Sequence, residues 1–156
     1  MFPLGSVLFP SVFLPLHVFE PRYRVLVRHC MDGDQEFGVV LIERGSEVGG
    51  DDVRTSVGTV ARILEANELA DGRWVLGTVG TRRIRVREWL ADDPHPRAVV
   101  EDWADTEADS TTADAYQRVL GRLRRVLALK AELAEPAVDA TIELTGDPGL
   151  GSFQVA

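Results

Sequence analysis

The sequence is poor in two residue types on which common protein chemistries depend. It contains one cysteine, Cys30, among 156 residues, so no disulfide can form within the chain. A chain without disulfides suits a reducing compartment, and we expect a cytoplasmic protein. Only Lys130 among its 17 basic residues is a lysine, and the others are arginines.

The single lysine excludes two classes of enzyme. A P-loop needs a lysine that follows a glycine and precedes a serine or threonine, whereas Lys130 lies between Leu129 and Ala131. A Ser-Lys dyad would have to use the same lysine, which falls within a helical apolar pattern. We therefore predict a protein that is not an enzyme and has neither ATPase nor peptidase activity.

Long apolar runs are absent as well. No stretch reaches the roughly 18–20 apolar residues that a membrane-spanning helix needs. The apolar start is interrupted by Pro3, Pro10 and Pro15, and it has neither a basic segment nor a small-residue cleavage site. We expect this segment to belong to the folded mature protein rather than to a signal peptide. We also expect no association with a membrane.

Metal and nucleic acid are poor candidates as ligands. His17, His29 and His95 lie far apart, and no Cys-x-x-Cys or His-x-x-x-His spacing occurs, so we expect no metal site and no cofactor. The net charge of −8 disfavours a phosphate backbone as partner.

The first thirty residues contain the clearest structural pattern. Residues 12–19 alternate with a period of two, which predicts a strand, and Pro15 within it indicates a sheet edge or a bulge. Both faces of this strand are largely apolar, so we expect both to be covered. From Pro21 the period changes to that of a helix, which ends at Asp32-Gly33 with Gly33 available for a left-handed conformation. Its apolar face consists of Tyr23, Leu26, Val27 and Cys30.

Short strands follow this helix. Asp71-Gly72 indicates a hairpin and Gly80 a further turn. In residues 82–89, Ile84 and Val86 point one way and the intervening arginines the other. The predicted strands span residues 37–43, 57–65, 73–79, 82–89 and 97–103. The sequence therefore predicts six or seven short strands in a compact antiparallel or mixed barrel with one inserted helix.

The composition changes after the last strand. Residues 101–114 contain six acids and no base, which indicates a solvated linker, and Ser110, Thr111 and Thr112 offer a helix N-cap. A helix over residues 112–135 carries an apolar stripe wider than one barrel face covers, and a second short helix begins at Asp147-Pro148, with Leu150 and Phe153 facing inward. The stripe comprises Tyr116, Val119, Leu120, Leu123, Val126, Leu127 and Leu133. Either the carboxyl-terminal tail is poorly ordered or a second copy of the chain covers the stripe. Of these we favour the second and predict a homodimer that forms through the stripe, at residues 115–135.

Several motifs resemble the amino-terminal substrate-binding domain of the Lon protease family. They are Phe2-Pro3-Leu4, Leu8-Phe9-Pro10, the block from Leu14 to Tyr23, Phe37 to Ile42, Val57 to Ala61, and Gly80 to Val86. The resemblance implies an α+β fold: a PUA-like β-barrel over residues 1–103, an acidic linker over 104–114 and a helical extension over 115–156. It implies a standalone form of that domain, without the ATPase and protease modules.

The same resemblance implies a function in protein recognition without catalysis. The ligands would be unfolded or extended polypeptide segments, bound near the strand-to-helix junction. The residues in question are Leu16, His17, Phe19, Glu20, Arg22 and Tyr23. A structural interpretation competes for two of them, since Glu20 can start the helix and Arg22 can pair with a neighbouring strand. An adaptor that docks onto a separate protease is a further alternative.

A second surface offers a different function. Arg83, Arg85 and Arg87 stand in a row on one strand face, as an anion or RNA site of a PUA-like domain would need. The simpler interpretation is a solvated outer face that is neutralised by the acidic linker and by Glu65 and Glu68.

Overall fold

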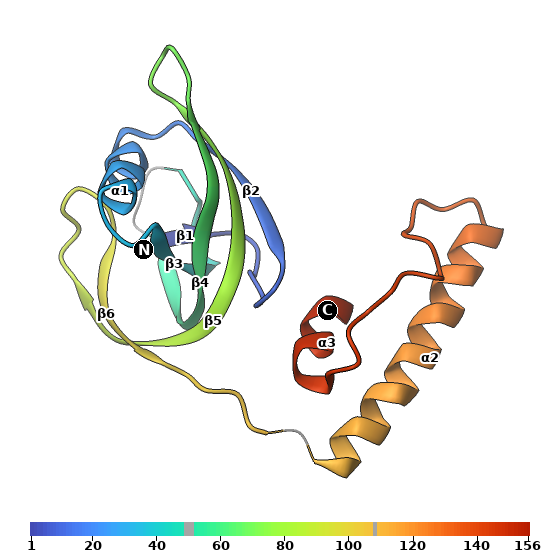
Figure 1. Ribbon diagram of the computed structural model, residues 1–156. Helices are drawn as coiled ribbons and strands as arrows, with labels where there is room; N and C mark the ends of the chain where they lie inside the picture. Colours follow the sequence, from blue (N-terminus) through green and yellow to red (C-terminus); the bar gives the residue numbers. More distant parts are fainter. Residues whose placement is uncertain (49–51, 108) are drawn as a thin grey trace. The chain divides into compact units, whose positions relative to one another are not determined.

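The computed structural model describes residues 1–48, 52–107 and 109–156 (Figure 1). It divides into two compact units, Met1–Ala104 and Asp105–Ala156. The first unit contains all the strands and one helix, and the second contains two helices. None of the helices in these described residues is long and apolar enough to cross a membrane.

The first unit is a six-stranded sheet that curls into a half-barrel. The strands are β1 (Phe2–Leu4), β2 (Phe13–Val18), β3 (Glu36–Arg44), β4 (Val53–Glu68), β5 (Trp74–Leu90) and β6 (Arg97–Asp102). Their order is β1-β3-β4-β5-β2, and β6 also pairs with β5. Only the β1–β3 pair is parallel among the described strands. The α+β class and the strand number are confirmed, whereas the likeness to PUA domains stays a prediction.

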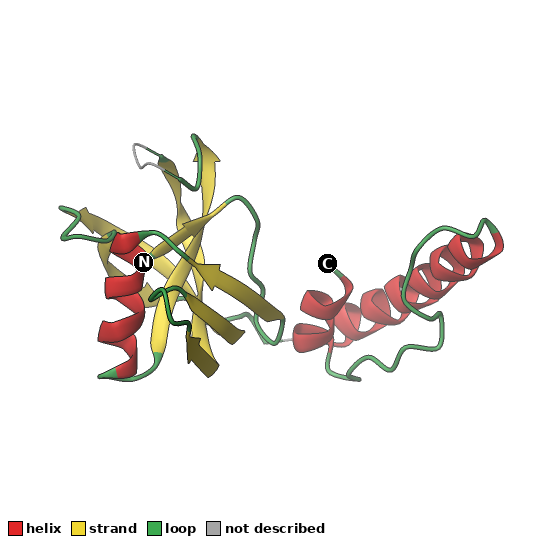
Figure 2. Ribbon diagram, turned by 90° about the horizontal axis from the view of Figure 1, so that it is seen from above, coloured by secondary structure: helices red, strands yellow, loops and turns green. Residues whose placement is uncertain are grey.

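Helix α1 (Pro21–Met31) supplies one wall of the core. Pro21 occupies the first turn as predicted, and Glu20 is the N-cap residue. The predicted face of Tyr23, Leu26, Val27 and Cys30 is buried against β1, β3, β4 and β5. Figure 2 shows this helix along one side of the strands. The left-handed residue after the helix is Gln35 rather than Gly33, and its N–H donates to the Cys30 carbonyl at 3.0 Å.

Strand β2 differs from the prediction on one face. Leu14, Leu16 and the fully buried Val18 pack on the core, but Phe13, Pro15 and His17 on the other face are exposed. The core lies on one side of this strand only, so alternate residues of β2 are exposed even though they are apolar. The expectation that both faces are covered is wrong, while the edge position that Pro15 indicated is correct.

The turn predicted at Gly80 is also wrong. Strand β5 runs without interruption through Gly80, where a bulge bends it. At this point the β1–β2 loop crosses the strand: the Ser11 N–H donates to the Gly80 carbonyl at 2.8 Å, and the Gly80 N–H donates to the Val12 carbonyl at 3.0 Å. A Cβ at position 80 would collide with the Phe9 carbonyl, so this glycine permits a close backbone approach.

We expect Gly80→Ala to lower the free energy of unfolding by about 2 kcal/mol or more, because backbone rather than a flexible side chain must move. Chemical denaturation measures this change. Gly77→Ala on the same strand is the matched control, since its new methyl would meet side chains alone: the exposed Phe13 ring at 3.3 Å and Glu65 Cβ at 3.8 Å. Equal loss of stability in both variants would show that the close approach of the β1–β2 loop does not restrict the residue at position 80.

The second unit contains α2 (Ser110–Glu132) and α3 (Pro148–Val155). Asp109 caps α2 by accepting from the Thr112 N–H at 2.8 Å, so Ser110 to Thr112 lie within the helix and do not cap it. Helix α2 therefore begins inside the stretch predicted as linker. Asp147 caps α3 by accepting from the Leu150 N–H at 2.8 Å, as the Asp-Pro pair predicted.

Tyr116 joins the two helices. It is buried against Gly151, and its hydroxyl donates to the Thr145 carbonyl at 2.7 Å. Phe153 is half-buried, but Leu150 is exposed, so its predicted inward position is wrong. Gly151 takes the inner position because only a residue without a side chain fits beneath the Tyr116 ring.

The apolar stripe of α2 is only partly covered. Tyr116 and Leu127 are buried, and Leu120 and Leu123 are half-buried. The exposed remainder of the stripe comprises Val119, Val126 and Leu133, and Leu129 on the same helix is also exposed. Exposed apolar residues in a row on a helix favour an interface, so the homodimer stays our prediction.

We expect Val126→Glu to weaken self-association at micromolar concentration, because a charge would be desolvated in the dimer. Sedimentation velocity measures the change. The control is Arg118→Glu, which alters the charge of the same exposed helix outside the stripe. A monomeric wild-type protein at these concentrations would show that the prediction is wrong.

Candidate functional site

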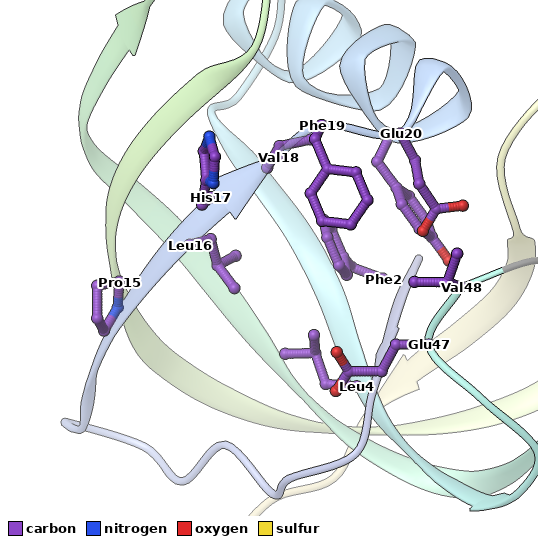
Figure 3. Close-up of a pocket in the computed structure, with 11 residues that line it drawn as sticks. Phe2, Leu4, Pro15, Leu16, His17, Val18, Phe19, Glu20, Glu47 and Val48 are labelled. Atoms are coloured by element: carbon purple, nitrogen blue, oxygen red, sulfur yellow. The ribbon is translucent and has the colours of Figure 1, made fainter.

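The half-barrel is not closed between its two terminal strands. Among the described residues, β1 pairs only with β3, and β2 pairs only with β5. We call the open gap between β1 and β2 the seam. A pocket of about 190 Å³ lies in it (Figure 3).

The pocket collects residues from four segments of the chain. Five of the six predicted ligand-binding residues line it, and Arg22 does not. The lining residues are Phe2 and Leu4 of β1, Pro15 to Val18 of β2, Phe19, Glu20 and Tyr23 at the start of α1, and Glu47 and Val48 of the β3–β4 loop. Sequence patterns missed Phe2, Leu4, Glu47 and Val48. The apolar start of the chain was a signal for Phe2 and Leu4, whereas nothing local distinguishes Glu47 or Val48.

Tyr23 lies between the pocket and the core. It is 3% exposed, and its ring stacks on Phe2 with centroids 4.2 Å apart. The Arg22 guanidinium lies 4.5 Å from the centre of the same ring. Burial, which outweighs the nearby Arg22 charge, raises the pKa of Tyr23 to about 12, so the hydroxyl stays protonated. None of the hydrogen bonds within the described chain involves this hydroxyl.

Arg22 holds the junction together rather than lining the pocket. Its Nε donates to Glu20 Oε2 at 3.1 Å, with both side chains less than one-fifth exposed. Its Nη2 donates to the Glu47 carbonyl at 3.3 Å. Arg22 was predicted to pair with a neighbouring strand. It instead binds Glu20 and the β3–β4 loop, and its guanidinium can reach both acceptors at once because its N–H donors point in different directions.

Two aromatic side chains at the two ends of the β2 segment are exposed. Phe19, which lines the pocket, is 51% exposed, and Phe13, the first residue of β2, is 59% exposed. His17 is also exposed, with its ring centroid 6.3 Å from that of Phe19. An apolar surface next to unpaired strand edges is suited to contact with another chain.

The arginine side chains of the row on β5 contact Glu101 on β6 and Trp103, which directly follows β6. Arg87 pairs with Glu101 at 2.6 Å. Arg83 and Arg85 lie over the Trp103 ring, 5.1 and 4.0 Å from its centre. Glu101 belongs to the acidic stretch, as the simpler interpretation predicted. Glu65 and Glu68 instead bond Asn67 and Arg28, so their predicted share in neutralising the row is wrong.

The fold brings together two histidines that the sequence keeps far apart. His29 Nδ1 lies 3.4 Å from His95 Nε2, and His95 Nδ1 lies 3.2 Å from the Pro96 carbonyl. The contact joins α1 to the β5–β6 loop. The two ring nitrogens are within hydrogen-bond distance of each other. No group of three or more metal-ligating side chains occurs among the described residues. No sequence spacing could have revealed it, since 66 positions separate the rings.

Burial lowers the pKa of His95 below its ordinary 6.5, and the His29 and Arg97 charges add to this effect. The unfolded chain therefore binds the proton more tightly than the folded chain. The stability that neutral His95 contributes is complete above about pH 6.5 and is lost as pH falls through the lowered value.

We expect His95→Gln to flatten the fall in unfolding free energy between pH 7 and pH 5. Urea denaturation at several pH values gives the slope. His17→Gln removes an exposed histidine and should keep the wild-type slope. Parallel curves for wild type and His95→Gln would contradict the role of His95.

The arrangement of a curled six-stranded half-barrel with α1 is shared with known structures. A Lon N-terminal domain protein from Xanthomonas campestris is 36% identical, with a TM-score of 0.55 over 76% of this chain and 70% of that one. The N-terminal domain of a Mycobacterium avium complex Lon protease has a TM-score of 0.57 over 85% of this chain and 68% of the other. At 17% identity, this second likeness concerns the fold alone.

Residues 1–156 match the family model of the ATP-dependent protease La (LON) substrate-binding domain, and the chain belongs to that family. All 156 residues fall within this one domain, so they include neither an ATPase nor a protease module. The resemblance found in the sequence is thereby confirmed.

Curated relatives are much longer than this chain. A Lon protease of Cytophaga hutchinsonii is 32% identical over 152 residues, which are 94% of this chain and 19% of that protein. A LON peptidase N-terminal domain and RING finger protein of Schizosaccharomyces pombe is 24% identical over 69% of this chain and 25% of its own length. The chain thus spans about a fifth to a quarter of these relatives.

Proposed function

We propose that this protein binds extended segments of other polypeptides at the seam, without catalysing a reaction on them. The observation that carries the proposal is the position of the pocket between two strand edges that have no partner in the described chain. The description of the family as a substrate-binding domain supports a polypeptide as the ligand.

Strand addition explains how such a site binds without strict sequence preference. An extended chain that enters the seam offers backbone N–H and C=O groups to the free edges of β1 and β2. These groups are the same in every polypeptide, but only an unfolded or extended segment exposes them in a row. Pro15 has no N–H, so β2 offers fewer donors than a full strand edge.

Side chains at the site would add affinity. Phe19 lines the pocket and is half exposed, and Phe13 adds a second exposed ring on β2. Aromatic residues at the centre of an interface commonly contribute most of its binding energy. Phe19 is therefore our choice as the main contact.

The RNA alternative has less support. The pairing of Arg87 and the stacking of Arg83 and Arg85 on Trp103 leave this row as a structured outer face. The overall charge of −8 also opposes binding to phosphates. The adaptor alternative, in which a separate protease is the partner, stays a prediction.

The test uses reduced, carbamidomethylated ribonuclease A as an unfolded ligand and native ribonuclease A as its folded counterpart. Both forms carry the same basic residues, so general attraction to an acidic protein is the same for both. We expect binding of the unfolded form only, slower hydrogen exchange of the β2 amides in the complex, and weaker binding of Phe19→Ala by about 1–2 kcal/mol.

Leu64→Ala is the matched control, because Leu64 is 62% exposed on β4 and does not line the pocket. Its affinity should equal that of wild type. Equal binding of native and unfolded ribonuclease A, or protection confined to β6, would refute the proposal. A steep loss of binding with salt would indicate a charge-driven surface instead.

A further inference from the structure

The seam pocket is too small for a cofactor or a drug-sized molecule. Its volume is about 190 Å³, whereas small-molecule sites usually measure roughly 300–1,000 Å³. The space suits one long amino-acid side chain. Since the proposed ligand is an extended polypeptide, the question becomes which kind of side chain the pocket accepts.

The titratable side chains that line the pocket are two glutamates, one histidine (His17) and Tyr23. Glu20 and Glu47 contribute carboxylates, and no arginine or lysine is among the lining residues. Figure 3 shows Glu20 beside Phe19 and the Glu47 carboxylate beside Leu4. The two glutamates come from different segments, one from the β2–α1 junction and one from the β3–β4 loop.

Each carboxylate is only partly satisfied by the described residues. Arg22 binds Oε2 of Glu20, and the Gly5 N–H binds Oε1 of Glu47. The other oxygen of each group is left as an acceptor. Only the Glu20 carboxylate is paired with a guanidinium, that of Arg22, so the negative charge of Glu47 is left without a cationic partner in the described chain.

Tyr23 adds a further polar group to the pocket. The residue lines the pocket and is 3% exposed, and none of the hydrogen bonds within the described chain involves its hydroxyl. The hydroxyl can therefore exchange a hydrogen bond with water for one with a polar group of a ligand.

The walls of the pocket are apolar and therefore suit a methylene chain. Leu4, Leu16 and Val18 are among its lining residues. A purely aliphatic or aromatic guest would desolvate ionised carboxylates without giving them donors. A lysine or arginine side chain has an apolar stem and several donors at its tip, so it matches both parts.

We propose that the seam pocket holds a lysine or arginine side chain of the bound polypeptide, with its cationic head between Glu20, Glu47 and the Tyr23 hydroxyl. This inference rests on the proposed function, because it assigns a preference within the same site. The domain then selects extended segments in which a basic residue lies among apolar ones.

The experiment uses an acetylated, amidated nonapeptide of alternating threonine and valine with one central guest residue. The guests are lysine, acetyl-lysine, norleucine and glutamate, and calorimetry gives the affinities. We expect the lysine peptide to bind about 10-fold more tightly than the norleucine peptide, which keeps the stem but lacks the charge. Glutamate should bind most weakly.

Variants locate the preference in the pocket. Glu47→Gln should reduce the lysine preference to about 3-fold or less, and Glu20→Gln should do the same even if it loosens Arg22. Glu65→Gln is the control, because Glu65 lies on β4 and does not line the pocket. A peptide with lysine at one end instead of the centre controls for general charge attraction.

Equal affinity for the lysine and norleucine guests would overturn this inference and leave peptide binding at the seam intact. A lysine preference that survives in both glutamine variants, or that persists with terminal lysine, would also overturn it. Failure of every peptide to bind would overturn the inference together with the proposed function.

Discussion

The first unit depends on one close contact, the crossing of the β1–β2 loop over Gly80. Two backbone hydrogen bonds, between Ser11 and Gly80 and between Gly80 and Val12, fix the loop to the middle of β5. Thr59 on β4 adds a third link by donating to the Leu8 carbonyl at 2.6 Å. This contact places β2 on the first half of β5 and leaves the second half for β6. It thereby sets where the terminal strands lie and where the sheet stays open.

Sequence patterns correctly predicted the features that depend only on neighbouring residues in the chain. The helical face around Tyr23 and Leu26 follows from period alone, and the hairpin at Gly72 follows from a residue that tolerates its φ of 78°. Gly80 was misjudged because a glycine that ends a strand and one that admits another backbone look identical in sequence. The outer face of β2 was misjudged because an apolar residue such as Phe13 does not reveal whether anything covers it.

The candidate site shows the same division. The segment around Phe19 and Tyr23 could be identified from the sequence, since its residues are contiguous and resemble a family motif. Glu47 could not, because its place in the pocket depends on the β3–β4 loop reaching the β2–α1 junction, where Arg22 holds it by one hydrogen bond. The His29–His95 contact depends likewise on packing between distant segments. Long-range geometry, rather than local propensity, decides which polar groups meet.

An open sheet edge normally invites copies of the same protein to stack into fibres. Here β1 has only three residues and β2 carries Pro15, so neither edge can template a long ladder. Two seams brought face to face would also oppose their own Glu20 and Glu47 carboxylates, and like charges repel. The half-barrel can therefore leave a gap in its sheet for foreign chains while it discourages its own copies from polymerising there.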